Sequence, residues 1–162
     1  MRQTTQLYLA NEASTQRLAA CFAAQMKVGD VVLLSGGLAA GKTFFVRAAV
    51  AALGARAEVT SPTYTIANIY RAPIGTIVHV DAYRLENAFE FEDLALEDEL
   101  DSGVTFIEWG ADLADEFDAW VSLELTPDPA KAGARHAVLS ASGQRGDVLL
   151  AQALAAFQGA GA

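Results

Sequence analysis

The fold is decided by residues 31–43, which read Val31-Val32-Leu33-Leu34-Ser35-Gly36-Gly37-Leu38-Ala39-Ala40-Gly41-Lys42-Thr43. The first part is an uninterrupted apolar run, typical of a strand buried on both faces of a sheet. The second part, from Gly36 to Thr43, matches the phosphate-binding pattern G-x-x-x-x-G-K-[ST]. The following apolar residues predict a helix from Thr43 to Leu53, closed by Gly54. A buried strand, a glycine-rich loop and a helix therefore follow one another in the order that phosphate binding requires.

The chemistry of this loop rests on its backbone as much as on its side chains. Glycines let backbone N–H groups turn toward a β-phosphate, and the helix N-terminus adds the positive end of its dipole. In this pattern Lys42 reaches the β- and γ-phosphates, and the Thr43 hydroxyl binds Mg²⁺. The remaining positions that we expect around the phosphates are Gly36, Gly37, Leu38, Ala39, Ala40 and Gly41. The alternative is a glycine-rich turn that merely precedes a helix. The probability that such a chain matches the pattern by chance is on the order of 1%.

Two further apolar runs end in a carboxylate, Ile77–Asp81 and Thr105–Glu108. Ligands of open α/β sheets sit outside the carboxyl ends of the strands, where both acids would lie. A phosphate-binding loop needs such an acid to complete the Mg²⁺ shell. Asp81 is a candidate for Mg²⁺ contact, directly or through water, and Glu108 for a metal ligand or for orienting an attacking water. We expect His79 to be a hydrogen-bonded core residue and Trp109 to serve packing.

The remaining pattern alternates strands with helices, which predicts an α/β fold with a mostly parallel central sheet flanked by helices. We expect one domain over residues 1–162, with a disordered tail after about residue 158. The other predicted helices are Asn11–Lys27, Asn87–Leu100 and Asp147–Phe157. The other predicted strands are Tyr64–Tyr70, Thr76–Val80, Val104–Ile107, Val121–Leu125 and Ala137–Ser140.

Composition excludes several classes of protein. The 162 residues are 52% hydrophobic, enough for a packed core rather than a disordered chain. No apolar run approaches the roughly 20 residues of a membrane span, and no secretory signal is expected at the N-terminus. A single cysteine excludes an intramolecular disulfide, so the cytoplasm is the expected location. The net charge of −9 argues against a nucleic-acid-binding surface over most of the molecule.

Four motifs resemble those of the TsaE (YjeE) family of bacterial ATPases, in the same order and spacing. They are the loop at residues 35–43, then Ser61-Pro62-Thr63-Tyr64-Thr65, His79-Val80-Asp81-Ala82-Tyr83-Arg84 and Ile107-Glu108-Trp109. The resemblance runs from about Asn11 to Ser142 and is weak after that. Four ordered motifs are more specific than the phosphate-binding loop alone.

The resemblance implies a cytoplasmic, Mg²⁺-dependent ATPase, weak alone and activated by its partners, TsaD and TsaB. Such an enzyme is needed for the threonylcarbamoyl modification of adenosine 37 in tRNAs that read ANN codons. It implies that Lys42 and Thr43 bind ATP–Mg²⁺ and that Asp81 and Glu108 complete the metal and hydrolytic site. It also implies a switch segment at Ser61, Pro62 and Thr63, and further nucleotide contacts at Asn11, Glu12, Thr15, Gly133 and Arg135. We expect a monomer when the protein is alone, with no direct tRNA contact and no membrane contact.

Two loop positions depart from the family pattern Gly-Asp-Leu-Gly. Gly37 replaces an acid that could steady the loop, and Ala39 replaces a glycine where a positive φ is expected. A residue with a Cβ in that conformation costs about 1–2 kcal/mol. These departures bear on nucleotide affinity more than on nucleotide identity.

Three other functions compete with an ATPase. A small-molecule kinase of this loop class would need an arginine-rich lid, whereas no arginine lies between Arg84 and Arg135. A nucleotide-gated binding module with incidental hydrolysis is compatible with the same residues. A GTPase is disfavoured because the chain has no N-K-x-D motif.

Charge is distributed unevenly along the chain. Residues 85–130 hold 15 of the 20 acids and no lysine or arginine. A solvated face that keeps the protein in solution explains most charge runs. Here the lack of cationic i+4 partners for Glu92, Asp93, Glu97 and Glu99 leaves charge available to a partner. We therefore predict that this face docks on a basic surface of the partner complex, beside the nucleotide site, and repels tRNA.

Overall fold

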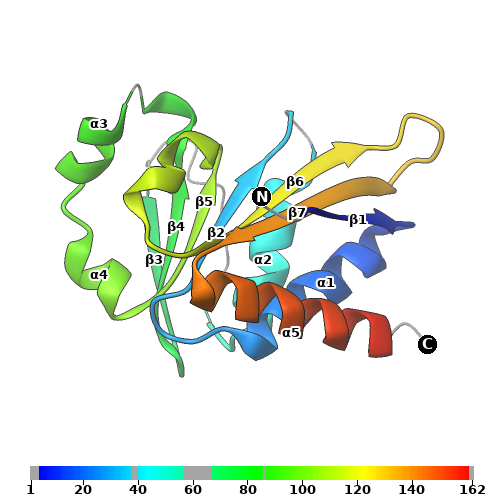
Figure 1. The fold of residues 1–162 in the computed structure, drawn as a ribbon, viewed down its shortest axis with the longest axis horizontal. Coiled ribbons are helices and arrows are strands. Elements are labelled where there is room, and N and C mark those ends of the chain that lie inside the picture. Colours follow the sequence, from blue (N-terminus) through cyan, green and yellow to red (C-terminus); the bar gives the residue numbers. More distant parts are fainter. Residues whose placement is uncertain (1–3, 38–39, 57–66, 86, 161–162) are drawn as a thin grey trace.

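The structure, a computed structural model, describes residues 4–37, 40–56, 67–85 and 87–160. One seven-stranded sheet runs through it in the order β1-β7-β6-β2-β5-β4-β3 (Figure 1). The strands are β1 (Thr4–Leu9), β2 (Val31–Ser35), β3 (Ala67–Ala72), β4 (Gly75–Asp81), β5 (Gly103–Glu108), β6 (Trp120–Pro127) and β7 (Arg135–Ser142). The helices are α1 (Glu12–Gln25), α2 (Lys42–Ala52), α3 (Ala88–Asp93), α4 (Glu97–Asp101) and α5 (Gln144–Ala160), with short 3-10 turns η1 (Ala82–Arg84) and η2 (Ala111–Glu116).

The centre of the sheet is parallel and its two edges are antiparallel. β2 pairs in parallel with β5 on one side and with β6 on the other, and β4 pairs in parallel with β5. β1, β7 and β3 add the antiparallel edges. The carboxyl ends of β2, β4 and β5 consequently meet at one edge, where Asp81 lies directly beside Glu108 in the register. The predicted fold class, α/β with a mostly parallel central sheet, is confirmed.

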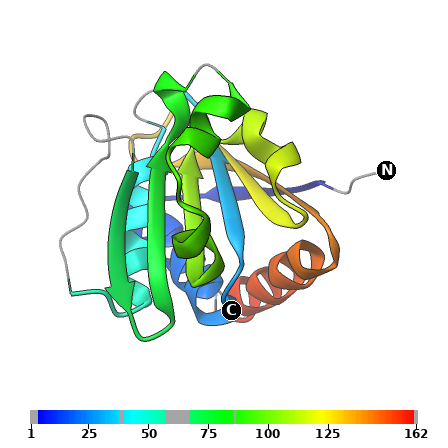
Figure 2. The same cartoon turned by 90° about the vertical axis from the view of Figure 1, so that its left-hand side faces the viewer.

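Helices cover both faces of the sheet, so that β2 is buried on both sides. Val32 and Leu34 pack in a core with α1, α2 and α5, whereas Val31 and Leu33 pack in a second core beneath α3, α4 and η2. Figures 1 and 2 show these two helical layers on opposite faces. The alternation follows from the period of two residues in a strand. In the described ranges, no helix combines the length and the apolarity needed to cross a bilayer.

Most predicted elements are present, with three corrections. β1 was not predicted, although it pairs with β7 along its whole length. The helix predicted at Asn87–Leu100 is divided into α3 and α4, because Ala95 between them adopts a left-handed φ of 54°. The predicted Asn87 cap is present, since its side chain accepts from the backbone N–H of Glu90 at 3.1 Å. α5 extends to Ala160, so the described part of the tail predicted after about residue 158 is helical.

A partly buried ion pair fastens α5 to the turn that precedes β2, at the end of the strand opposite the phosphate-binding loop. Arg145 donates from Nε to Asp30 Oδ1 at 2.8 Å and from Nη2 to Asp30 Oδ2 at 2.9 Å. The same Nη2 donates to the carbonyl oxygen of Gln25 at 2.8 Å. The Asp30 side chain is 2% exposed, so the guanidinium supplies most of the hydrogen bonds that replace its solvent.

Candidate functional site

The loop between β2 and α2 has the backbone that its glycines predict. Gly36 has φ of 131°, and a Cβ there would clash with the carbonyl oxygen of Leu125. Gly41, the residue that precedes α2, has φ of 104°. Both values lie in the left-handed region that favours glycine. The loop therefore turns sharply into an 11-residue helix, whose first N–H groups have no partner within the helix.

Lys42 begins α2 and extends its amine back into the loop. Nζ donates to the carbonyl oxygens of Gly36 and Gly37, at 2.8 Å each. The residue is 5% exposed, and burial lowers the pKa of its amine, while the charges of Glu108 and Asp81 partly oppose that shift. The amine is thus held inside the concave side of the loop, where phosphate oxygens can replace the two carbonyls.

Trp109 covers this amine. Its ring centroid lies 4.0 Å from Lys42 Nζ, a cation–π contact, and its indole packs against Tyr83 with centroids 5.1 Å apart. Trp109 has φ of 60°, a left-handed conformation that costs about 1–3 kcal/mol for a residue with a side chain. We expected Trp109 to serve packing alone. The structure instead places it at the wall of the site, in a strained conformation often found at ligand sites.

Glu108 links three elements at the carboxyl end of β5. Thr43 Oγ1, from the first turn of α2, donates to both of its carboxylate oxygens at 2.8 and 3.0 Å. His79 Nε2, from β4, shares a hydrogen bond of 2.5 Å with Glu108 Oε2. His79 is fully buried, and its Nδ1 has no hydrogen-bond partner among the described residues. The expectation of a hydrogen-bonded core histidine is confirmed, and its partner is the acid we had singled out.

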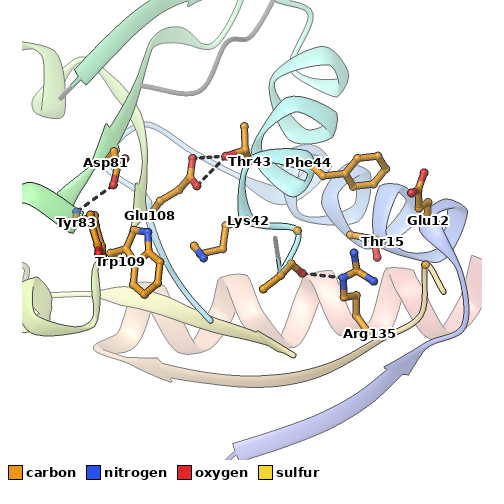
Figure 3. Close-up of a pocket in the computed structure, with 13 residues that line it drawn as sticks. Glu12, Thr15, Lys42, Thr43, Phe44, Asp81, Tyr83, Glu108, Trp109 and Arg135 are labelled. Carbon is orange, nitrogen blue, oxygen red and sulfur yellow. Dashed lines mark hydrogen bonds between the residues drawn. The ribbon is translucent and has the colours of Figure 1, made fainter. Parts of the chain in front are cut away.

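Asp81 ends β4 beside Glu108. Its Oδ1 accepts from the backbone N–H of Tyr83 at 3.0 Å, which fixes the carboxylate at the start of η1. The two acids and Thr43 lie on the same side of the pocket (Figure 3). Two strands that are parallel neighbours thus supply both carboxylates, as their positions in the sequence predicted.

These groups open into a pocket of about 460 Å³, within the range of small-molecule sites. Its lining consists of Glu12, Thr15, Ala40, Gly41, Lys42, Thr43, Phe44, Asp81, Tyr83, Glu108, Trp109, Gly133 and Arg135. Glu12 and Thr15 come from α1, Gly133 from the β6–β7 connection and Arg135 from the start of β7. Glu12, Thr15 and Arg135 lie across the pocket from Asp81 and Glu108 (Figure 3). Arg135 Nε donates to the carbonyl oxygen of Ala40 at 2.8 Å, which ties β7 to the loop.

The other predicted site residues that the structure describes lie outside this lining. Asn11 caps α1, where its side chain accepts from the backbone N–H of Ser14 at 2.8 Å. Gly36 and Gly37 contribute the carbonyls that hold Lys42. Leu38, Ala39 and the segment Ser61-Pro62-Thr63 lie outside the described residues. Sequence reasoning missed Phe44 and Tyr83 as lining residues, since an aromatic beside a motif is more often part of the core.

The donor set fits Mg²⁺ bound together with a nucleotide. A hydroxyl at Thr43 and carboxylates at Asp81 and Glu108 are hard oxygen ligands. Within the described ranges no three His, Cys, Asp or Glu side chains converge as a metal cage, so protein alone supplies few ligands. Mg²⁺ is commonly held by one or two carboxylates and by substrate phosphates, which matches this arrangement.

Comparison with known proteins identifies the family. The family model described as threonylcarbamoyl adenosine biosynthesis protein TsaE matches residues 9–136, well over half of the chain. This chain belongs to the TsaE family. The match spans every residue that lines the pocket, and it confirms the resemblance carried by the four sequence motifs.

Relatives named tRNA threonylcarbamoyladenosine biosynthesis protein TsaE occur in distant bacteria. The one from Rickettsia bellii is 40% identical over 106 residues, covering 65% of this chain and 74% of the relative. The one from Bacillus subtilis is 36% identical over 140 residues, covering 86% of this chain and 87% of the relative. The crystal structure of Bacillus subtilis YdiB superposes with a TM-score of 0.74 and 25% identity, covering 94% of this chain and 95% of YdiB.

Proposed function

We propose that this chain is a Mg²⁺-dependent ATPase that acts in the threonylcarbamoyl modification of adenosine 37 in tRNAs that read ANN codons. Its working partners in this proposal are TsaD and TsaB, which supply the transferase site. The observation that carries the proposal is the convergence of Lys42, Thr43 and Glu108 at one helix N-terminus, within a pocket of about 460 Å³. Membership of the TsaE family supports the pathway.

The hydrogen bonds at the site suggest how its residues act on ATP. Lys42 Nζ exchanges the carbonyls of Gly36 and Gly37 for β- and γ-phosphate oxygens, which carry more negative charge. The loop N–H groups and the start of α2 hold the β-phosphate. Trp109 covers the amine and excludes water from one side of it. Mg²⁺, when bound, neutralises charge on the phosphates.

In this proposal Glu108 orients the attacking water. In the structure the Thr43 hydroxyl donates to both carboxylate oxygens of Glu108. When nucleotide and Mg²⁺ are bound, that hydroxyl would face the metal instead, and the Glu108 oxygens would be free to accept from water. Glu108, held by His79, then orients the water that attacks the γ-phosphate, releasing ADP and phosphate. Asp81 completes the metal site. Ser61, Pro62 and Thr63 act as the switch segment, and Asn11, Glu12, Thr15, Gly133 and Arg135 surround the adenine and ribose.

Hydrolysis assays with and without the partners test this proposal. We expect slow ATP hydrolysis alone, faster hydrolysis with TsaD–TsaB, and loss of both in Lys42→Ala. Lys27→Ala is the matched control, since Lys27 is exposed and does not line the pocket. Full activity in Lys42→Ala would refute the assigned site. Nucleotide-dependent partner binding without any partner-stimulated turnover would favour the gated binding module instead.

A further inference from the structure

A second hollow lies on the face opposite α1, α2 and α5. It has a volume of about 290 Å³ and lies between α3, α4 and η2. Its lining is Phe91, Glu92, Leu96, Glu97, Leu100, Glu116 and Phe117, and we name it the acidic groove. It shares no lining residue with the nucleotide pocket, so the two can be altered separately.

The floor of the acidic groove is apolar. Phe91 is 6% exposed and meets Phe117 edge to face, with ring centroids 5.8 Å apart. Leu96 and Leu100 are half-buried beside them. On α3, Phe89 is 76% exposed, an unusual exposure for so large an apolar side chain. It precedes Glu92 by three residues and so lies on the same side of that helix, which extends the apolar surface next to the groove.

The rim of the groove is negative. Glu92, Glu97 and Glu116 are all exposed, and no hydrogen bond or ion pair joins their carboxylates to another described residue. The lining contains no cation. Three unpaired carboxylates around an apolar floor match a ligand that is both cationic and apolar.

We propose that the acidic groove binds a basic, amphipathic segment of the partner protein, with lysine or arginine side chains at the three glutamates and an apolar side chain on the floor. This inference rests on the proposed function, because the partner meant is the TsaD–TsaB complex. A second copy of this chain, which also carries a net charge of −9, would be repelled. Nucleic acid and anionic membrane surfaces would be repelled for the same reason.

Two triple variants that remove the same number of negative charges distinguish a specific role of the acidic groove from a general effect of the net charge. Glu92→Gln, Glu97→Gln and Glu116→Gln together remove three charges from the rim while preserving side-chain shape. Asp98→Asn, Asp101→Asn and Asp115→Asn together remove three charges from exposed positions on α4 and η2 outside the groove lining. Both triple variants should retain the melting temperature and ATP affinity of the wild type, because neither touches the nucleotide pocket.

The test is biolayer interferometry against immobilised TsaD–TsaB, at low and at high salt. We expect the groove variant to associate at least about tenfold more slowly at low salt, and the control variant to stay close to wild type. The difference should shrink as salt rises. If the two variants bind alike while the wild type binds, the inference is overturned and the proposed function stands. If the wild type does not bind, the proposed partners are wrong and the inference falls with them. A wild-type dimer that dissociates in the groove variant would also overturn it, in favour of self-association.

Discussion

Replacing Glu108 separates the binding of ATP from its hydrolysis. In Glu108→Ala, Thr43 and His79 lose the acceptor that they share, while Lys42 and the loop that hold phosphate are untouched. A water-orienting group acts mainly in the transition state, so its removal should lower turnover far more than affinity. We expect turnover by the complex with TsaD–TsaB to fall by about 10²–10⁴-fold, and ATP affinity to change by less than about tenfold, or 1.4 kcal/mol.

Glu108→Ala should also lower the stability of the protein, because it removes hydrogen bonds that the structure contains. His79 is fully buried and loses the partner of its Nε2, whereas Thr43 borders the pocket and can turn to water. An unsatisfied buried polar group costs about 1–3 kcal/mol. Removing the carboxylate adds a small cavity, so the free energy of unfolding should fall by about 2–4 kcal/mol. Glu108→Gln keeps the shape and an acceptor for Thr43, and should lose turnover with a smaller loss of stability.

Three measurements on each variant decide whether Glu108 acts in the transition state of hydrolysis or as a ligand of bound ATP–Mg²⁺. Calorimetry gives the ATP–Mg²⁺ affinity, phosphate release with TsaD–TsaB gives turnover, and urea denaturation gives the free energy of unfolding. Asp115→Ala is the control, because Asp115 is an exposed acid that lines neither the nucleotide pocket nor the acidic groove. A loss of affinity equal to the loss of turnover in Glu108→Gln would refute the water-orienting role and make Glu108 a ground-state ligand.

Four further predictions concern the loop and the fold. Lys42→Ala should abolish ATP binding in calorimetry, and unchanged affinity would exclude Lys42 from the phosphate site. Burial lowers the pKa of Lys42 below the usual 10.5. The amine is positively charged below its pKa and loses that charge as the pH rises through it. ATP affinity should therefore decline at a less alkaline pH than it would if Lys42 were an exposed lysine. Gly37→Asp should fold normally, since a Cβ there meets nothing within 4 Å, and should tighten ATP binding by steadying the loop. Unchanged binding would show that the departure from the family pattern is harmless, and weaker binding would contradict the steadying role. Arg145→Met should lower the free energy of unfolding by about 3 kcal/mol, because the buried Asp30 carboxylate loses its cation and keeps the hydrogen bond from the Lys27 backbone N–H. Urea denaturation measures it against the exposed Arg71→Met, and a loss no larger than in that control would contradict the assignment.

The acids at the ends of β4 and β5 were predicted from the sequence because short-range patterns determine them. An apolar run ending in a carboxylate predicts a strand end, and parallel strands present their carboxyl ends at one edge. The left-handed conformation of Gly41 and the cap at Asn87 are local in the same sense. Each depends on a few neighbouring residues, so the sequence alone is sufficient to predict it.

Other features depend on contacts between residues far apart in the chain. β1 exists because β7 accepts its backbone pairing along the whole strand. Ala95 divides the predicted acidic helix although alanine favours helices, since Leu94, Leu96 and Leu100 on either side of it pack against the second core. Tertiary packing outweighs a propensity of less than about 1 kcal/mol per residue.

By itself the sequence determined the family, the phosphate-binding loop and the two carboxylates, because motif and periodicity are properties of neighbouring residues. Only the tertiary structure decided which groups those residues meet. Trp109, at the end of β5, covers the Lys42 amine, and His79 on β4 reaches Glu108 on the neighbouring strand. Arg135 holds the loop at Ala40, although the two residues are 95 positions apart in the chain. The acidic groove is of the same kind, since its three glutamates are brought together only where α3, α4 and η2 pack over one apolar floor. Such pairings depend on how layers pack, and packing is a property of the whole chain rather than of any short stretch of it.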